Sequence, residues 1–437
     1  MSIQADQQKC LDFLEGALEG LGVVAAREKT QKISNLIVGS MSGQWRLFHT
    51  PDHIFQVGLD SDDIEVISAL FHDSIYVQVD KDIHSGLLSY IASFMSVSDK
   101  QIFITNNSKL LNDASLKLCL MTFGFDLGQR LISTEGQNEF LSALFAAKAL
   151  EDSLPLPILS QIISCIEATI PFRESDHEGI SCSEQQYEKL KKINQVFEFS
   201  WIDDDIQKIV ERGVRLANRD VIGFASESPG CFLDDTWKLI PETNHDLWPL
   251  SICTISTYRA ALQKMEIFLS ALKAESVIRK YKNEPSDEKY AYLIYSINRN
   301  LEIGCAYLGV KLLSCAVLEA LSSRNFKEQP SEILRAELAQ NSMLAASFES
   351  PLSTKIDEEL LSLLKQKRSL ELGCDEISSP IGIFILKEIG IENAQSLLYE
   401  ARQFFSGELS SEDFLSHCPR DLIAGIMSST QLPSNPK

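Results

Sequence analysis

The sequence lacks several features that mark particular classes of protein. No block of Lys and Arg occurs in the 437 residues, and the formal net charge is −21, so binding to nucleic acid is not expected. The ten Cys include no Cys-x-x-Cys pair and no dense framework, which is typical of a reducing compartment. We therefore expect a cytoplasmic protein that attracts a phosphate-bearing ligand through a bound cation or a few placed basic side chains.

Long uninterrupted apolar runs are also scarce. Residues 1–21 are polar and acidic, so we expect no signal peptide there. The most apolar stretch, residues 301–321, contains Glu302, Lys311 and Glu319, and such charges are costly inside a bilayer. We expect this stretch to be a core helix and expect no membrane contact.

Strand-like alternation of β-branched residues is nearly absent, and residues 101–105 form its only short patch. Apolar residues recur at three and four positions elsewhere, which predicts an all-α fold. We expect a helical layer over residues 1–44, a dense helical domain over 45–272 that holds nearly all the histidines, and a C-terminal helical bundle over 273–437. The bundle is punctuated by Pro330, Pro351 and Pro380, and its amphipathic helices suit a protein partner or self-association.

Two histidines stand at the start of a predicted helix. In the run Phe48-His49-Thr50-Pro51-Asp52-His53, Thr50 is a good N-cap and Pro51 suits the first helical position. His53 then lies in the first turn and His49 just before it.

A third histidine stands beside an aspartate on an apolar helix. His72 and Asp73 lie beside the buried stripe of Ile64, Ile67, Phe71 and Ile75, and we expect both to lie inside that helix. Burying an imidazole and a carboxylate there is costly unless they are paired or bind a metal ion. The second pair, His245-Asp246, follows turn residues and is expected to be a loop.

A further carboxylate is predicted from helical periodicity. Between residues 201 and 225 the apolar positions define one helical face, and Asp220 falls on it. Asp203, Asp204 and Asp205 open that helix, where carboxylates favour the exposed amides. Asp205 stays open as the alternative ligand.

These residues resemble the HD superfamily of metal-dependent phosphohydrolases, in which a His-x-x-x-His element, a His-Asp pair and a later Asp surround one or two divalent ions. The resemblance implies an HD-type helical core, His53, His72 and Asp73 as metal ligands together with a later Asp, and His49 as the proton donor to the leaving group. Helical periodicity favours Asp220 as the later Asp. Asp73 also belongs to the implied catalytic set. Imidazole and carboxylate donors suit Mn, Fe, Zn, Co or Mg.

A weaker part of the resemblance lies downstream. Asn138-Glu139-x-x-Ser142-Ala143 and Ala168-Thr169 are similar to elements of small predicted HD phosphohydrolases, although about sixty residues separate them from the first part. Glu139 and Thr169 are therefore candidate substrate-binding residues. Arg46 and Arg173 are candidate phosphate contacts on chemical grounds.

The predicted function is hydrolysis of a small phosphomonoester or phosphodiester, including nucleotide-type substrates, by metal-bound hydroxide. The long C-terminal part favours an alternative, a regulatory or interaction protein that retains the metal site. A third reading, a diiron oxygenase, would need extra ligands from His49, His84 or Glu139.

Overall fold

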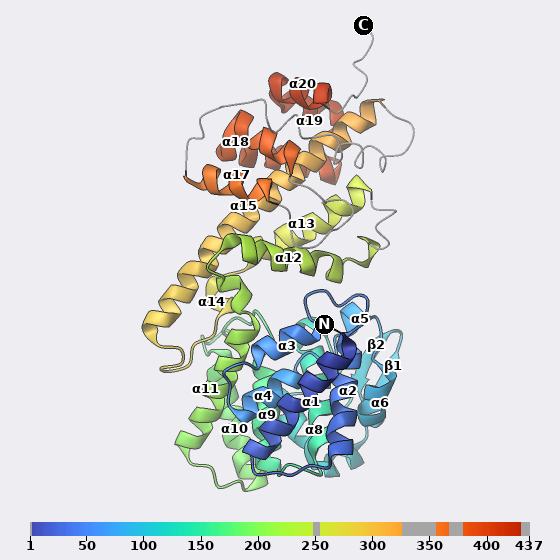
Figure 1. The fold of residues 1–437 in the computed structure, drawn as a ribbon, viewed down its shortest axis with the longest axis vertical. Helices are drawn as coiled ribbons and strands as arrows, with labels where there is room; N and C mark the ends of the chain where they lie inside the picture. The colour runs from blue at the N-terminus through green and yellow to red at the C-terminus, as the bar shows by residue number, and fades with distance from the viewer. Residues whose placement is uncertain (1, 248–253, 326–354, 367–378, 430–437) are drawn as a thin grey trace. The chain divides into compact units, whose positions relative to one another are not determined.

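The computed structural model describes residues 2–247, 254–325, 355–366 and 379–429. The chain forms two compact units. Unit 1 comprises Met1–Gly223 and Lys273–Tyr295, and unit 2 comprises Phe224–Leu272 and Ser296–Lys437. Both are built from helices (Figure 1), which confirms the predicted all-α class.

Unit 1 holds the N-terminal helices and a short hairpin. Its helices are α1 (Ile3–Gly20), α2 (Arg27–Met41), α3 (Pro51–Val57), α4 (Asp63–Phe71), α5 (Val77–Asp80), α6 (Ser85–Ile91), α7 (Ala114–Phe123), α8 (Gln137–Leu150), α9 (Leu156–Ala168), α10 (Cys182–Phe197), α11 (Asp203–Asp220) and α14 (Ala274–Val277). Short 3₁₀ helices are η1 (Ala92–Phe94), η2 (Ser108–Asn112), η3 (Ser133–Glu135) and, ending in unit 2, η4 (Ile222–Ala225).

The two units do not follow the predicted boundaries at residues 44 and 272. Helix α1 packs on α2 and α4, and its Leu14 and Leu18 share one buried core with Ile67, so the N-terminal layer belongs to unit 1. The segment after residue 272 also returns to unit 1. There Asn218 and Arg279 exchange two hydrogen bonds, of 2.9 and 2.8 Å, between the amide side chain and the backbone.

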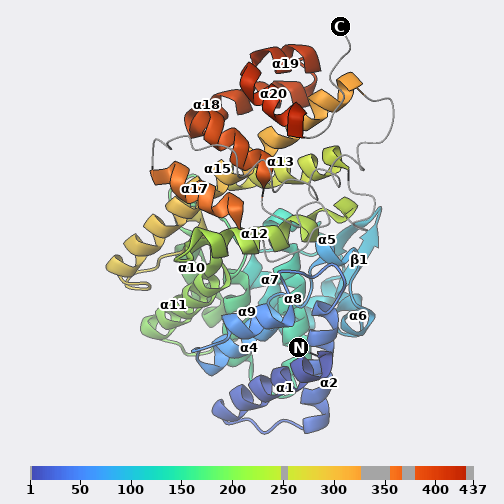
Figure 2. The same cartoon turned by 45° about the horizontal axis from the view of Figure 1, so that its top comes forward.

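Helix α9 lies at the centre of unit 1, against α4, α7, α8 and α11 (Figures 1 and 2). From Leu159 onward almost every residue of this helix is buried, as expected of a helix that is apolar on all sides. Gly213 lets α11 approach it closely, because a Cβ there would lie 3.0 Å from the Cβ of Ala168. This packing brings the end of α11 to the site described below.

The predicted strand at residues 101–105 is β2 (Gln101–Ile104), and it pairs antiparallel with β1 (Met95–Ser98). Ile102 and Ile104 of β2 are buried, whereas Val97 of β1 is 66% exposed. Strand β1 was not predicted, because only the buried strand carries an apolar alternation. The turn residues Asp99 and Lys100 both have positive φ, as a tight hairpin requires.

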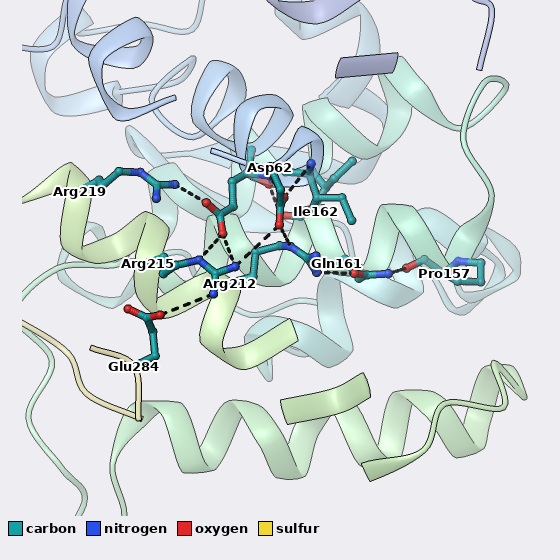
Figure 3. Close-up of polar contacts among 11 residues, drawn as sticks. Asp62, Pro157, Gln161, Ile162, Arg212, Arg215, Arg219 and Glu284 are labelled. Carbon is teal, nitrogen blue, oxygen red and sulfur yellow. Dashed lines mark hydrogen bonds and ion pairs between the residues drawn. The ribbon is translucent and has the colours of Figure 1, made fainter. Parts of the chain in front are cut away.

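Ion pairs join α4 to α11 on one side of unit 1 (Figure 3). The buried carboxylate of Glu65 lies 2.6 Å from guanidinium nitrogens of both Arg215 and Arg219. Asp62, which caps α4 through the amides of residues 64 and 65, also lies 2.7 Å from Nε of Arg212. We call these five residues the α4–α11 ion-pair cluster.

Unit 2 is a separate helical assembly. Its elements are α12 (Pro229–Thr243), η5 (His245–Leu247), α13 (Ile255–Ala271), most of α15 (Asp287–Asn325), α17 (Lys355–Lys365), α18 (Pro380–Ser406), α19 (Ser411–His417) and α20 (Arg420–Ser429). Helix α18 packs on α17, α19 and α20. Pro380 begins α18 as predicted, and Pro330 and Pro351 lie outside the described residues.

Helix α15 is the long apolar segment noted in the sequence. By length and composition alone it could cross a membrane, yet 83% of its most apolar window is buried inside the protein. The predicted core helix at residues 301–321 lies within it. Such burial is typical of a core helix, which passes the same composition test.

Glu65→Ala tests the α4–α11 ion-pair cluster. Removing the carboxylate leaves two arginines facing each other, and we expect the free energy of unfolding to fall by about 2 to 3 kcal/mol, less than for a fully buried pair, because both arginines are partly exposed. Urea denaturation measures the change. Asp204→Ala is the matched control, because its pair with Lys208 on α11 is exposed and should contribute little. Equal stability of both variants would contradict the assignment.

Candidate metal centre

Four side chains converge in unit 1, and they are the four predicted metal ligands. His53, His72, Asp73 and Asp220 each offer a ligand atom, and these atoms lie within 4.8 Å of one another. Nε2 of His53 is 2.9 Å from Oδ1 of Asp220, and Nε2 of His72 is 3.0 Å from Oδ2 of Asp73. Donor atoms about 2.1 Å from a common ion stand roughly 3.0 to 3.4 Å apart. The four distances between a histidine and an aspartate, 2.9 to 3.5 Å, lie close to this spacing.

His53 is positioned by the start of α3. Thr50 is the N-cap and Pro51 the first helical residue, as predicted, although the Thr50 hydroxyl makes no capping bond. The amide of His53 donates to the Thr50 carbonyl at 3.0 Å. The ring of Phe48 lies 5.0 Å from the imidazole, so one side of His53 is covered by an apolar group.

His72 and Asp73 lie at the end of α4, and the prediction that they lie inside the helix was wrong. Helix α4 ends at Phe71, His72 is its C-cap, and Asp73 belongs to the following turn. Nδ1 of His72 lies 2.8 Å from the carbonyl oxygen of Ala69. His72 still has helical dihedrals, φ −55° and ψ −38°, and both side chains contribute a ligand atom to the group.

Asp220 is the last residue of α11. Its side chain is 15% exposed and lies within the group. The alternative, Asp205, is exposed at the other end of the same helix, where its carboxylate accepts a hydrogen bond from the Ile202 amide. Fifteen residues of helix separate the two by about 22 Å, so only Asp220 reaches the histidines.

The histidine tautomer follows from these contacts. A carbonyl oxygen can only accept, so Nδ1 of His72 carries a proton, and Nε2 of the neutral ring holds a lone pair. That lone pair faces the oxygens of Asp73 and Asp220, at 3.0 and 3.3 Å. Oδ2 of Asp73 is buried and has no hydrogen-bond partner among the described residues. Lone pairs on all sides repel one another unless a proton or a cation lies between them.

The electrostatics of the group agree with this geometry. Burial alone would lower the pKa of His72, but the carboxylates of Asp73 and Asp220 outweigh burial and raise that pKa well above its ordinary value. Burial likewise opposes ionisation of Asp220, yet His72 and His53 hold its pKa at about 2. Without a metal ion the group thus retains a proton at the place a cation would take.

His49 lies beside the group and is half-buried. Its ring centroid is 5.6 Å from that of His53 and 4.9 Å from that of Tyr76. It does not belong to the four-residue ligand set. The role of His49 as a proton donor stays a prediction.

The Asn138-Glu139-x-x-Ser142 element braces the turn after Asp73. The hydroxyl of Ser142 accepts a hydrogen bond from the Ile75 amide at 3.1 Å, and Oδ1 of Asn138 accepts one from the Val77 amide at 3.1 Å. Both side chains come from one face of α8, because they are four residues apart. The fold thus brings together the two parts of the resemblance, which about sixty residues separate in the sequence.

Glu139, between those two bracing residues in sequence, is placed next to the candidate ligands. Its Oε2 atom is buried and has no hydrogen-bond partner among the described residues. Burial, together with the charges of Asp73 and Asp220, raises the pKa of Glu139 to about 7. The carboxyl group therefore exchanges a proton near neutral pH, beside the ligand set and outside it.

The other predicted substrate contacts already have partners. Two nitrogens of Arg46 donate to the Asp80 carboxylate, and a third donates to the Asp73 carbonyl at 3.1 Å, so Arg46 positions the turn that carries Asp73. The Thr169 hydroxyl donates to the Ile166 carbonyl at the end of α9. Neither side chain reaches outward in this arrangement.

Arg173 differs from Arg46 and Thr169, because it lines a cavity as well as having a partner. It pairs with Glu167 at 2.8 Å and lines a pocket together with Arg279. No motif pointed to Arg279, a single arginine in a segment predicted to belong to the C-terminal bundle.

The histidines considered for other roles lie elsewhere. His84 caps α6 by accepting from the Gly86 amide, and His245 stands in η5 of unit 2 rather than in the predicted loop. Neither joins the ligand set.

Glu139→Gln tests the buried carboxyl group. A carboxyl whose pKa rises from 4.5 to about 7 on folding binds its proton more tightly in the folded state, so stability present below pH 4.5 is lost as pH rises through 7. We expect the metal-stripped wild type to lose about 3 kcal/mol of unfolding free energy across this window relative to the variant. Urea denaturation at pH 5 and pH 8 measures it. Glu135→Gln, at an exposed site, should behave as wild type, and parallel pH profiles for all three proteins would refute the assignment.

No protein-family model, curated protein or solved structure matches the chain. The functional assignment consequently depends on the residues and their geometry.

Proposed function

We propose that unit 1 is a metal-dependent phosphohydrolase that acts on small phosphomonoesters or phosphodiesters. The observation that carries the proposal is the convergence of four ligand atoms, from His53, His72, Asp73 and Asp220, within 4.8 Å of one another, with a buried oxygen of Asp73 that has no hydrogen-bond partner among the described residues. Two imidazoles and two carboxylates suit a divalent ion of the first transition row or Mg, and four protein ligands leave positions for water and a phosphate oxygen.

A divalent cation in this set would lower the pKa of a coordinated water and neutralise charge on a phosphoryl oxygen. The chain supplies the remaining functions. The bond from His72 Nδ1 to the Ala69 carbonyl keeps Nε2 directed at the ion position. Arg46 and Ser142 hold the turn around Asp73 through its carbonyl and the Ile75 amide. Ligands fixed in this way need little reorganisation on binding.

Two groups next to the ligand set can exchange protons. His49 is the proposed acid, whose imidazolium donates a proton to the leaving oxygen as the phosphorus–oxygen bond breaks. Glu139, whose pKa is about 7, is the proposed acceptor for a proton released from the attacking water. The two residues come from different segments of the chain. His49 precedes α3, and Glu139 lies in the first turn of α8.

Metal content is the first test of the proposal. We expect purified wild type to retain one or two divalent ions per chain, and His72→Ala and Asp220→Ala to lose at least tenfold in metal affinity, because each removes a ligand. Elemental analysis after gel filtration measures the content. His177→Ala is the control, since His177 is 89% exposed. Wild type without metal under all supplementation, or His72→Ala with full metal, would sink the proposal.

Measuring both turnover and metal content distinguishes the proposed role of His49 from that of the four metal ligands. On a panel of generic phosphomonoesters and phosphodiesters with Mn or Fe added, we expect His49→Ala to retain wild-type metal content while kcat falls by about 10²- to 10⁴-fold. The loss should be smallest for substrates with good leaving groups, which need no proton. His84→Ala, the control, should leave kcat unchanged. Full metal occupancy of wild type with no turnover on any substrate would instead favour a regulatory or interaction protein.

A further inference from the structure

A polar cavity in unit 1 is lined by none of the four candidate ligands, although its residue Arg279 is close enough to interact electrostatically with Asp220. The cavity has a volume of about 350 Å³ and is lined by two segments, one from Arg173 to Ser183 and one from Lys273 to Lys280. Four basic side chains line it, Arg173, Lys273, Arg279 and Lys280, together with the carboxylates of Glu174 and Glu275. The two lysines are paired, Lys273 with Glu174 and Lys280 with Asp287, so the two arginines carry the argument. We call this cavity the arginine pocket.

The charges at the back of the arginine pocket do not balance. The buried carboxylate of Glu167 lies 2.8 Å from Arg173 and 3.3 Å from Lys189, and the guanidinium of Arg279 is close enough to stabilise its negative charge. One carboxylate thus serves three cations. In a chain with a net charge of −21, a locally positive cavity needs an explanation.

Arg279 has no carboxylate of its own. Among the described residues its guanidinium makes one hydrogen bond, from Nη2 to the Ile170 carbonyl at 2.5 Å, and no ion pair. Burial and the neighbouring charge of Arg173 lower its pKa to about 10. Two guanidinium groups side by side repel each other, so this arrangement is costly until an anion joins them.

The fold also holds both arginines in place. Glu167 bonds Arg173 through its carboxylate and its carbonyl, and the Arg279 backbone is held by the two hydrogen bonds to Asn218. The Nε donor of Arg173 is buried and unbonded among the described residues. Pre-positioned guanidinium donors favour a tetrahedral or planar oxyanion, which accepts two hydrogen bonds from each fork.

A helix terminus adds to the positive potential. Ser181, Cys182 and Ser183, which open the 16-residue helix α10, line the same cavity. The Ser181 hydroxyl caps the Glu184 amide, whereas the amides of Cys182 and Ser183 have no partner among the described residues. Free amides at a helix start favour an anion.

We propose that the arginine pocket binds the phosphate group of a small phosphorylated molecule, between Arg173 and Arg279 and in front of the first turn of α10. The cavity is larger than a lone phosphate needs and falls in the range of small-ligand sites, so the remainder of the ligand also lies inside it. Binding here does not require a metal ion.

Isothermal titration of the full-length, metal-stripped protein in EDTA tests the proposal, with inorganic phosphate and glycerol phosphate as probes. Wild type should bind both, glycerol phosphate more tightly, and Arg279→Gln should weaken binding at least tenfold. Lys208→Gln, which removes one positive charge from the exposed face of α11, is the control and should bind as wild type. Equal affinity of Arg279→Gln and wild type, or no binding by wild type, would overturn the proposal.

A second measurement needs no variant. Cys182 lines the pocket and is partly exposed, whereas Cys231 is exposed in unit 2. Glycerol phosphate should slow alkylation of Cys182 and leave Cys231 unaffected, as peptide mass spectrometry reports. Unchanged labelling of Cys182 at saturating probe would contradict the proposal. His72→Ala should still bind phosphate in EDTA, so failure of the pocket and failure of the metal centre give different results.

Discussion

The buried carboxylate of Glu65 holds the candidate site together, because it joins α4, whose C-cap is His72, to α11, whose last residue is Asp220. Arg219 is its partner at 2.6 Å and also donates to the carbonyl of Val57, the last residue of α3. The three helices that carry the ligands are therefore tied at one point next to the site. A buried ion pair contributes modestly to net stability, yet here it determines which side chains can meet.

Charge is distributed unevenly within unit 1, and this unevenness explains the two polar sites. At the ligand set, two carboxylates lie within 3.5 Å of two imidazole rings, an arrangement that suits a cation. At the arginine pocket, guanidinium groups face one another and a negative charge is missing. Neither arrangement is stable alone in a low-dielectric interior, and a cation at one site with an anion at the other would satisfy both.

Local sequence predicted the parts of this structure that depend on local physics. The Thr50-Pro51 helix start and the buried position of Asp220 follow from capping and from a 3.6-residue period, and both were found. The end of α4 at Phe71 was missed, since the apolar stripe continues through Ile75. Whether His72 coordinates a metal is still a prediction. Glu65 and its partners Arg215 and Arg219 are some 150 residues apart in the sequence. The spacing of apolar residues within a helix gives no information about contacts between residues so far apart.

Chain connectivity explains why the unit boundaries could not be placed from composition. The chain leaves unit 1 after Gly223, three residues beyond Asp220, builds α12 and α13 in unit 2, and returns at Lys273 to supply Arg279. Asn218 binds the returning segment at Arg279 and lies two residues before the last candidate ligand. A fragment cut at residue 272 would therefore lose one wall of the arginine pocket and the partner of Asn218 while keeping all four candidate ligands. The two units alternate along the chain, since unit 2 takes up Phe224–Leu272 and again Ser296–Lys437, so the two polar sites depend on different lengths of chain.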